Sequence, residues 1–227
     1  FLIPRKIRYI WLLVCSYYFY MCWNAKYAIL ILLSTAITYA SGLLMESIKQ
    51  KKYDAQKEKK LKNWVVVLSF ASNLSILFYF KYINFALSTL GGMLHFAHIE
   101  LNVPTFDIIL PVGISFYTFQ SAAYIIDLYR SKIEADSSLP RFALFLSFFP
   151  QIVQGPIARY DQLAGQLYEG HSFSYTNFTH GMQLILWGFF KKLVIADRVA
   201  VLVSQVFDNY GDYHGAIVFV ALLGYSV

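Results

Sequence analysis

The sequence predicts an all-α protein that crosses a membrane several times. Of its 227 residues, 58% are hydrophobic and only 14% are charged, and apolar runs of membrane-spanning length recur along the chain. Soluble domains are nearer to about half apolar and about a quarter charged. The aromatic content of 19% also suits a protein with much lipid-facing and interfacial surface. A polytopic membrane protein is therefore the expected class.

Four apolar segments are long enough to cross a bilayer as helices, which takes about 20 residues each. They are residues 7–23, 27–45, 64–90 and 106–128. Residues 180–207 are also long enough but carry charges in their second half, and another span begins at Ala216. The run at residues 144–153 is too short to cross by itself.

Basic residues orient these spans. The loop after the second span contains seven lysines: Lys49, Lys51, Lys52, Lys57, Lys59, Lys60 and Lys62. By the positive-inside rule this loop is cytoplasmic, so the third span leads outward and the fourth returns inward. The net charge of +6 arises from residues beside the spans, which indicates membrane orientation and not nucleic-acid binding. The topology after residue 140 stays open.

The remaining chemistry-bearing residues indicate no metal centre and no bound cofactor. Cys15 and Cys22 lie on one helix face two turns apart, too far to bridge within a helix. His95, His98 and Glu100 are a loose set that an interfacial loop explains better than a metal site. With no linker visible, we expect residues 1–227 to form one transmembrane domain, truncated at the C-terminus and also at the N-terminus.

The fourth span carries a polar stripe. Its members recur at spacings of four, three, four and three residues: Gly113, Tyr117, Gln120, Tyr124 and Asp127. At helical pitch they share one face, and lipid cannot satisfy a glutamine or an aspartate. The stripe therefore faces either a helix–helix seam or a water-filled cavity, and the sequence does not choose between them.

A second stripe follows the later apolar segment. Its members are His180, Gln183, Trp187, Lys191 and Arg198, with Val194 filling the remaining turn. Lys191, Lys192, Asp197 and Arg198 also form a charged cluster in a largely apolar region. Lys192 is expected to extend to the lipid headgroups, whereas Lys191 fits either that role or the polar face.

The stretch "LFLSFFPQIVQGPIARY", residues 144–160, concentrates helix breakers and amides. Pro150, Gly155 and Pro156 interrupt the helix, while Gln151 and Gln154 supply hydrogen-bond donors and acceptors. Broken backbone at membrane depth occurs only where it is buried in protein or lines water. The stretch predicts a re-entrant segment that Arg159 returns to an interface, with a kinked span as the alternative.

Three motifs, "LPVGISFYTFQSAAYIIDLYR", "FLSFFPQIVQGPIARYDQL" and "WGFFKKLVIADRVA", together resemble the membrane-bound O-acyltransferase superfamily. The resemblance runs from about residue 106 to 209 and is closest to the bacterial branch that contains the alginate O-acetyltransferase membrane subunit. It implies a ring of tilted and broken helices around a central funnel in the bacterial cytoplasmic membrane. It also implies an acyl donor on the cytoplasmic side, such as acetyl-CoA or an acyl-carrier thioester. The acceptor is a polysaccharide hydroxyl, with extracytoplasmic acetyltransferase proteins as partners.

In that family the essential histidine lies in a later membrane segment, expected here beyond Val227, and none of the five histidines occupies its position. No catalytic residue is therefore named in this chain, and the chain alone is expected to be inactive. The residues expected to line or shape the funnel are Tyr117, Gln120, Tyr124, Asp127, Gln151, Gln154, Gly155, Pro156, Arg159 and Lys191. Three alternatives stay open: D-alanyl transfer toward teichoic acid by a sister group with the same fold, a non-enzymatic transporter, and a scaffold of a polysaccharide-export complex.

Overall fold

The computed structural model describes residues 4, 7–51, 53–96, 104, 106–108, 110–153, 155–169 and 172–226. Every regular element in these ranges is a helix, as the sequence predicts. Lys52, His98, Glu100 and Gln154, named above, lie outside the described residues. The chain divides into two compact units, Leu2–His171 and Ser172–Val227. The expectation that both belong to one membrane domain stays a prediction.

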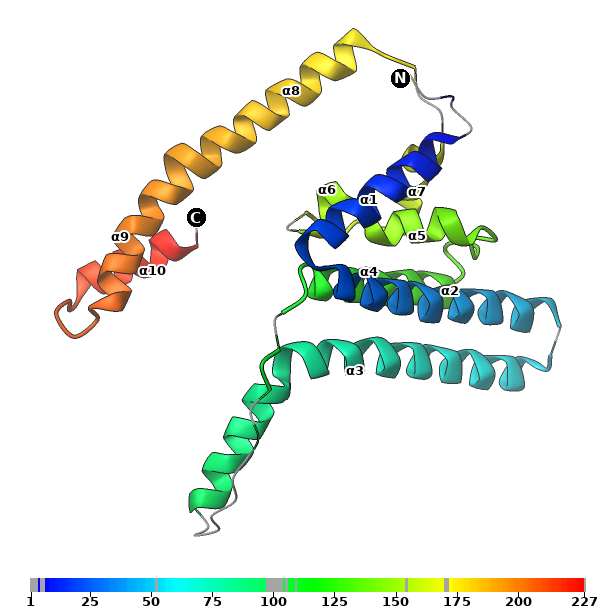
Figure 1. Cartoon of the computed structure of the whole chain (residues 1–227), viewed down its shortest axis with the longest axis horizontal. Coiled ribbons are helices and arrows are strands. Elements are labelled where there is room, and N and C mark those ends of the chain that lie inside the picture. The colour runs from blue at the N-terminus through cyan, green and yellow to red at the C-terminus, as the bar shows by residue number, and fades with distance from the viewer. Residues whose placement is uncertain are drawn as a thin grey trace. The chain divides into compact units, whose positions relative to one another are not determined.

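The first unit contains a sequence of helices that Figure 1 labels. They are α1 (Arg8–Asn24), α2 (Ala28–Gln50), α3 (Ala55–Phe96), α4 (Ile114–Tyr129), α5 (Leu139–Ser147), α6 (Phe149–Ile152) and α7 (Tyr160–Tyr168), with a short 3-10 turn, Ala25–Tyr27, between α1 and α2. Helices α2, α3 and α4 pack against one another, and α1 packs against α5 and α6. From the 3-10 turn, α1 and α2 diverge as an open V (Figure 1).

Two stretches of the described chain are long and apolar enough to cross a membrane, Arg8–Gln50 and Ala55–Leu94. The first comprises α1 and α2, which match the predicted spans at residues 7–23 and 27–45. The turn between them forms because the Asn24 side chain accepts a hydrogen bond from the Lys26 backbone N–H at 3.0 Å. Asn24 therefore ends one helix and positions the start of the next.

Small polar side chains join α2, α3 and α4. The Ser34 hydroxyl donates to the Asn73 side-chain oxygen at 2.5 Å, and the Asn73 amide donates to the Thr38 hydroxyl at 3.3 Å. The Ser34 and Ser121 hydroxyl oxygens lie 3.5 Å apart. All four side chains are buried, and small hydrogen-bonding residues of this kind are typical of close helix packing in membranes.

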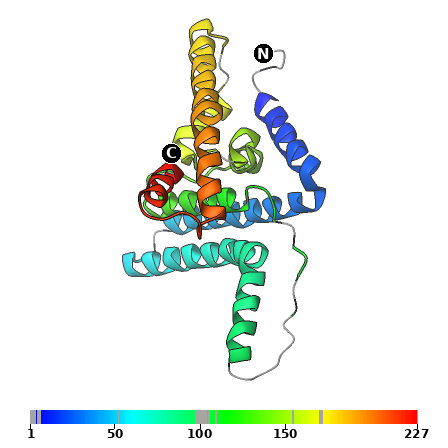
Figure 2. The ribbon, with the colours of Figure 1, turned by 90° about the vertical axis from the view of Figure 1, so that its left-hand side faces the viewer.

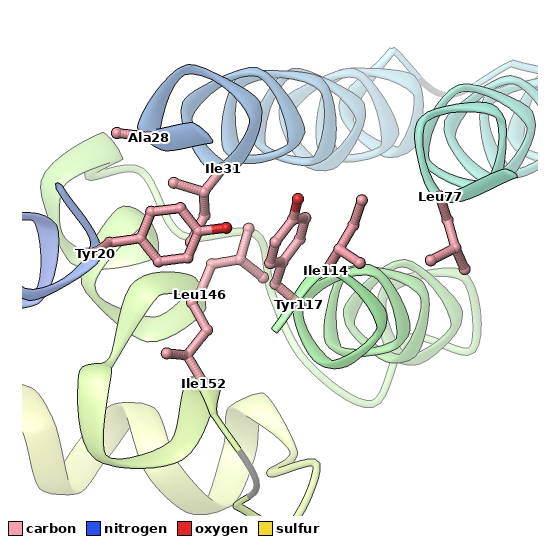
Figure 3. Packing of buried hydrophobic residues seen from close by; sticks show 8 residues of the cluster. All are labelled: Tyr20, Ala28, Ile31, Leu77, Ile114, Tyr117, Leu146 and Ile152. Atoms are coloured by element: carbon pink, nitrogen blue, oxygen red, sulfur yellow. The ribbon is translucent and has the colours of Figure 1, made fainter. Parts of the chain in front are cut away.

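An apolar cluster lies about one helical turn from these polar side chains. Its members come from α1 to α6, and Figure 3 shows how they lie: Tyr20, Ala28, Ile31, Leu77, Ile114, Tyr117, Leu146 and Ile152. The Tyr20 hydroxyl donates to the Val112 carbonyl at 3.0 Å, which ties α1 to the segment that leads into α4. Helix α4 begins at Ile114, so the predicted span at residues 106–128 is shorter as a helix than expected. Pro111 and the left-handed Gly113 explain this late start.

The second unit contains α8 (Tyr175–Phe189), a π-helical turn (Phe190–Ala196), α9 (Asp197–Asp208) and α10 (Ala216–Tyr225). The Ser174 side chain starts α8 by accepting a hydrogen bond from the Asn177 N–H at 3.3 Å. The first three elements follow one another without a loop, and α10 packs back against α9. The segment predicted at residues 180–207 therefore lies inside one helical run.

Candidate functional site

The helix break predicted at residues 144–160 is present. Helix α5 ends at Ser147, Phe148 leaves the helical region with ψ 106°, and α6 resumes for one turn with Pro150 in its first positions. Proline lacks the N–H that would bond to the carbonyl of Leu146 and clashes with that carbonyl, so α5 cannot continue through it. At the start of α6 the same proline is well accommodated.

Side chains from two distant helices satisfy the backbone groups that the break releases. The Phe145 carbonyl has lost its helical partner and accepts a hydrogen bond from the Gln120 amide on α4 at 3.1 Å. The Phe149 N–H donates instead to the Ser16 hydroxyl on α1 at 3.3 Å. Unpaired buried backbone groups are costly, so these two bonds make the break stable inside the protein.

The loop after α6 is closed by Gln151, one of the two glutamines that the sequence analysis singled out. The Gln151 side-chain N–H donates to the Pro156 carbonyl at 2.5 Å, and the Gly155 N–H donates to the Gln151 carbonyl at 2.8 Å. A Cβ on Gly155 would lie 2.7 Å from the Gln151 Cα, so the loop accepts only glycine there. Pro156 and Arg159 continue it as exposed residues.

Gly113 brings the start of α4 against the end of α6. Its φ is +73°, and a Cβ there would lie 2.3 Å from the Ile152 carbonyl oxygen. Both the left-handed conformation and the close approach of two backbones require glycine. The polar stripe of α4 therefore begins directly beside the helix break, as its predicted role in the same site requires.

The other described stripe residues are buried. Tyr117 and Tyr124 are each 1% exposed; the Tyr124 hydroxyl accepts a hydrogen bond from the Asp136 N–H at 3.2 Å, whereas the Tyr117 hydroxyl has no hydrogen-bond partner among the described residues. Asp127 is buried and lies 3.8 Å from the Lys132 Nζ. Both bonded partners belong to the loop after α4, so these contacts do not choose between a helix–helix seam and a cavity. The role of these residues in lining a funnel stays a prediction.

An aspartate that the sequence analysis did not single out organises the neighbouring surface. The Tyr160 hydroxyl donates to one Asp136 carboxylate oxygen at 2.6 Å, and the Ser138 N–H donates to the other at 2.8 Å. Burial and this hydrogen bond raise the pKa of the Tyr160 phenol well above its ordinary value. The phenol therefore stays a neutral donor that fixes α7 against the loop before α5.

The aromatic rings around Asp136 complete this cluster. The Tyr124 ring lies 4.7 Å from that of Phe142 and 5.1 Å from that of Tyr160, measured between centroids. The Tyr168 hydroxyl donates to the Arg141 carbonyl at 2.7 Å, and burial is the main cause of its raised pKa. The sequence held one signal for this site: an aspartate two residues before a serine at the start of a helix is typical of an Asx turn.

Lys191 belongs to the second unit, where its side chain is exposed on the π-helical turn. Lys192 forms an ion pair with Asp197, and its predicted extension to the lipid headgroups stays a prediction. The π-helical hydrogen bonds also change the period after Phe189, so Arg198 does not continue the α-helical face of His180 and Trp187. The predicted place of Lys191 beside the α4 stripe stays a prediction.

The described residues offer positioning chemistry. The Gln120 and Gln151 amides are bonded to backbone carbonyls, Arg159 is an exposed cation beside the break, and no group of three metal-ligating side chains occurs among the described residues. Such an arrangement holds a loop and a helix end in place, which is the contribution expected of residues that orient a substrate.

Three relatives show what the chain is similar to. It is 34% identical over its whole length to a protein of Azotobacter vinelandii named "Probable alginate O-acetylase AlgI", and equally to the protein of that name in Pseudomonas aeruginosa. It is 31% identical over 88% of its length to the "Peptidoglycan O-acetyltransferase" of Helicobacter pylori. The chain spans less than half the length of these relatives, 46%, 44% and 40% respectively. No family model and no solved structure matches it.

Proposed function

Because the chain belongs to the membrane-bound O-acyltransferase superfamily, in the branch of the alginate O-acetylases, we propose that it is part of an integral-membrane O-acetyltransferase acting on a polysaccharide. The donor is a thioester on the cytoplasmic side, such as acetyl-CoA or an acyl-carrier thioester. The acceptor is a hydroxyl of a cell-surface or exported polysaccharide. The protein lies as a multi-pass chain in the bacterial cytoplasmic membrane, and its helices form part of a ring around a funnel.

One observation carries this proposal. The same chain aligns with relatives named for two different glycans, alginate and peptidoglycan, and both names specify O-acetyl transfer. What these relatives share is therefore the handling of the acetyl group, whereas the acceptor differs. This supports acetyl transfer over the D-alanyl alternative, and an enzyme over a transporter or a scaffold.

The reaction breaks the thioester C–S bond, forms an ester C–O bond, and moves the hydroxyl proton to the leaving thiolate. In our proposal the helix break orients the acyl group, with Gln151, Gly155 and Pro156 shaping the loop and Arg159 at its exposed end. No residue of this chain is assigned the proton transfer. Extracytoplasmic acetyltransferase proteins are the partners in our proposal: one takes up the acetyl group as an ester on its own hydroxyl and passes it to the polysaccharide hydroxyl, so the reaction above is the sum of two transfers.

The test is a strain that lacks the gene, complemented with the full-length protein. Acetyl and D-alanine contents of the surface polymers are measured separately, together with the amount of polysaccharide exported. We expect the acetyl content to fall and to return on complementation. A fall in D-alanine would transfer the proposal to the sister reaction, and a fall only in exported polymer would support a transporter or scaffold.

A variant links this function to the helix break. Gln151→Leu removes the bond to the Pro156 carbonyl and releases the loop, so acetylation should fall severalfold while membrane abundance stays near normal. Gln166→Leu, on the exposed face of α7, is the matched control and should leave acetylation unchanged. Normal acetylation by Gln151→Leu would contradict the assignment of the break to the site.

A further inference from the structure

Helix α3 is too long for a single membrane crossing. Its 42 residues extend about 63 Å, twice the roughly 30 Å hydrocarbon thickness of a bilayer. A straight helix of that length would fit inside the hydrocarbon only at a tilt of about 60°, outside the observed range of 0–40°. Part of α3 therefore lies outside the spanning segment.

Two lysines delimit the part that matches the membrane. Lys62 and Lys81 are separated by about 29 Å of helix, and residues 63–80 between them contain no Asp, Glu, Lys or Arg. Lys62 belongs to the lysine-rich end and pairs with Glu58. Lysines at both ends of an apolar helix extend their charges to the two interfaces, so this spacing favours a crossing that ends near Lys81.

The packing of α3 changes at the same position. Leu77 lies in the apolar cluster, the Phe80 ring contacts that of Tyr27 at 6.1 Å, and the Lys81 Nζ donates to the Ser115 hydroxyl at 3.4 Å. Figures 1 and 2 both show α3 bent, with its C-terminal arm leaving the layer of α2 and α4. Beyond Lys81 the helix thus loses the neighbours that hold its first part.

The C-terminal arm, Tyr82 to Phe96, has two unlike faces. At helical spacing, Asn84, Ser88 and Gly92 continue the line of Lys81, and Asn84 bonds to the Phe106 backbone through both its amide and its oxygen, at 2.7 and 3.0 Å. Around the helix from that line, Phe85 and Phe96 border it, and Tyr82, Met93 and Leu90 lie on the side away from it; all five are exposed. Phe85 is 70% exposed and Phe96 89%. Apolar side chains exposed to this extent indicate a surface that contacts lipid or another protein.

We propose that this arm lies along the membrane surface at the end of α3 remote from the lysine-rich loop. Its apolar face enters the lipid acyl chains, and the line of Lys81, Asn84 and Ser88 faces the headgroups and water. An uncharged, aromatic-rich face opposite a polar face is the pattern of interfacial helices. Lipid is the occupant because the arm adjoins a helix whose apolar length already spans the bilayer.

The test measures the depth of single labels in the full-length protein, freed of its own cysteines, Cys15 and Cys22 among them. Nitroxide labels at Leu68 and Phe78 sample the crossing, and labels at Tyr82 and Met93 sample the arm; all four native side chains are exposed. Depth is read from relaxation by oxygen against a water-soluble nickel chelate. Labels at Leu68 and Phe78 should differ by about 15 Å, because a crossing helix rises about 1.5 Å per residue.

Labels at Tyr82 and Met93 lie about 20° apart around the helix, so in an arm that lies in the interface they should have similar, shallow depths, within about 5 Å of each other. If α3 continued as a straight crossing, they would differ by about 16 Å, which would overturn the proposal. Low exposure of both labels to both reagents would also overturn it, since a protein partner would then cover the face. Exposure of both to the nickel chelate alone would do the same, because the arm would then be in water.

A second readout does not depend on the spin labels. Ser88→Cys and Leu90→Cys lie on the polar and apolar faces of the arm, about 160° apart around the helix. A membrane-impermeant maleimide added to spheroplasts should modify Ser88→Cys at least several times faster than Leu90→Cys. Equal rates at both positions would contradict an arm that lies in the interface.

Discussion

The sharpest test of the site geometry is Gly113→Ala, at the contact between α4 and α6. The new Cβ would lie 2.3 Å from the Ile152 carbonyl oxygen and 2.8 Å from the Ile152 Cγ1. The first of these atoms is backbone, so no change of rotamer relieves the overlap. The left-handed conformation at φ +73° adds a further cost for any L side chain.

The two effects give a magnitude. A left-handed alanine costs about 1–2 kcal/mol, and overpacking against fixed atoms costs about 1–3 kcal/mol. The free energy of unfolding should therefore fall by about 2–5 kcal/mol. For proteins of this size about 1 kcal/mol corresponds to roughly 2–4 °C, so the apparent Tm in detergent should fall by roughly 5 °C or more.

Two further variants make this test specific. Gly92→Ala is the control, because its Cβ meets nothing within 4 Å and a helical glycine gains about 0.5–1 kcal/mol on replacement by alanine. Gly113→Asn separates strain from overlap, since asparagine tolerates the left-handed region but carries the same Cβ. We expect Gly113→Asn to recover the strain part, about 1 kcal/mol, and to stay less stable than the wild type because the overlap with Ile152 remains. Near wild-type stability of Gly113→Ala would refute the contact between α4 and α6.

Two other predictions concern the bonds around the break. Gln120→Leu leaves the Phe145 carbonyl buried without a partner, so the apparent Tm should fall by an amount equivalent to about 1–3 kcal/mol; an unchanged Tm would contradict that bond. Tyr160→Phe removes the donor to Asp136. Because the pKa of Tyr160 is raised in the folded protein, its contribution to stability is complete below the unfolded value of about 10 and is lost as the pH rises further. Thermal unfolding between pH 8 and 11 should therefore show a smaller alkaline loss for Tyr160→Phe, and equal losses would refute the assignment.

The sequence predicted the features that depend on local chemistry. The helix break follows from Pro150, which cannot continue α5, and the loop after it follows from Gly155. The ends of α1 and α2 follow from the length of their apolar runs and from Asn24. In each case the residues that determine the structure are neighbours in the chain, so a single sequence is sufficient.

The partners of the break were not predictable in the same way. Ser16 lies 133 residues from Phe149, and Gln120 lies 25 residues from Phe145. Which helix supplies the missing bond depends on how α1, α4 and α5 pack, and no local pattern records it. The bend of α3 has the same origin, because the apolar run continues through Lys81 while the packing partners end there.

Exposure sorts the predicted site residues into two groups with different expected behaviour. Gln120 and Tyr124 are buried and bonded to backbone, so their replacement affects stability and activity together. Arg159 is exposed at the end of the loop after the break, and its side chain forms no hydrogen bond or ion pair with the residues that the structure describes. Arg159→Gln keeps most of the side-chain length and removes the charge.

If the loop meets an anionic or carbonyl-bearing substrate, Arg159→Gln should lower acetylation severalfold. The apparent Tm should stay within about 1 °C of the wild type, because exposed substitutions usually change stability by less than about 0.5 kcal/mol. Gln162→Ala, on the exposed side of α7, is the control. A parallel loss of Tm and acetylation would show that Arg159 supports the fold, and unchanged acetylation would remove it from the site.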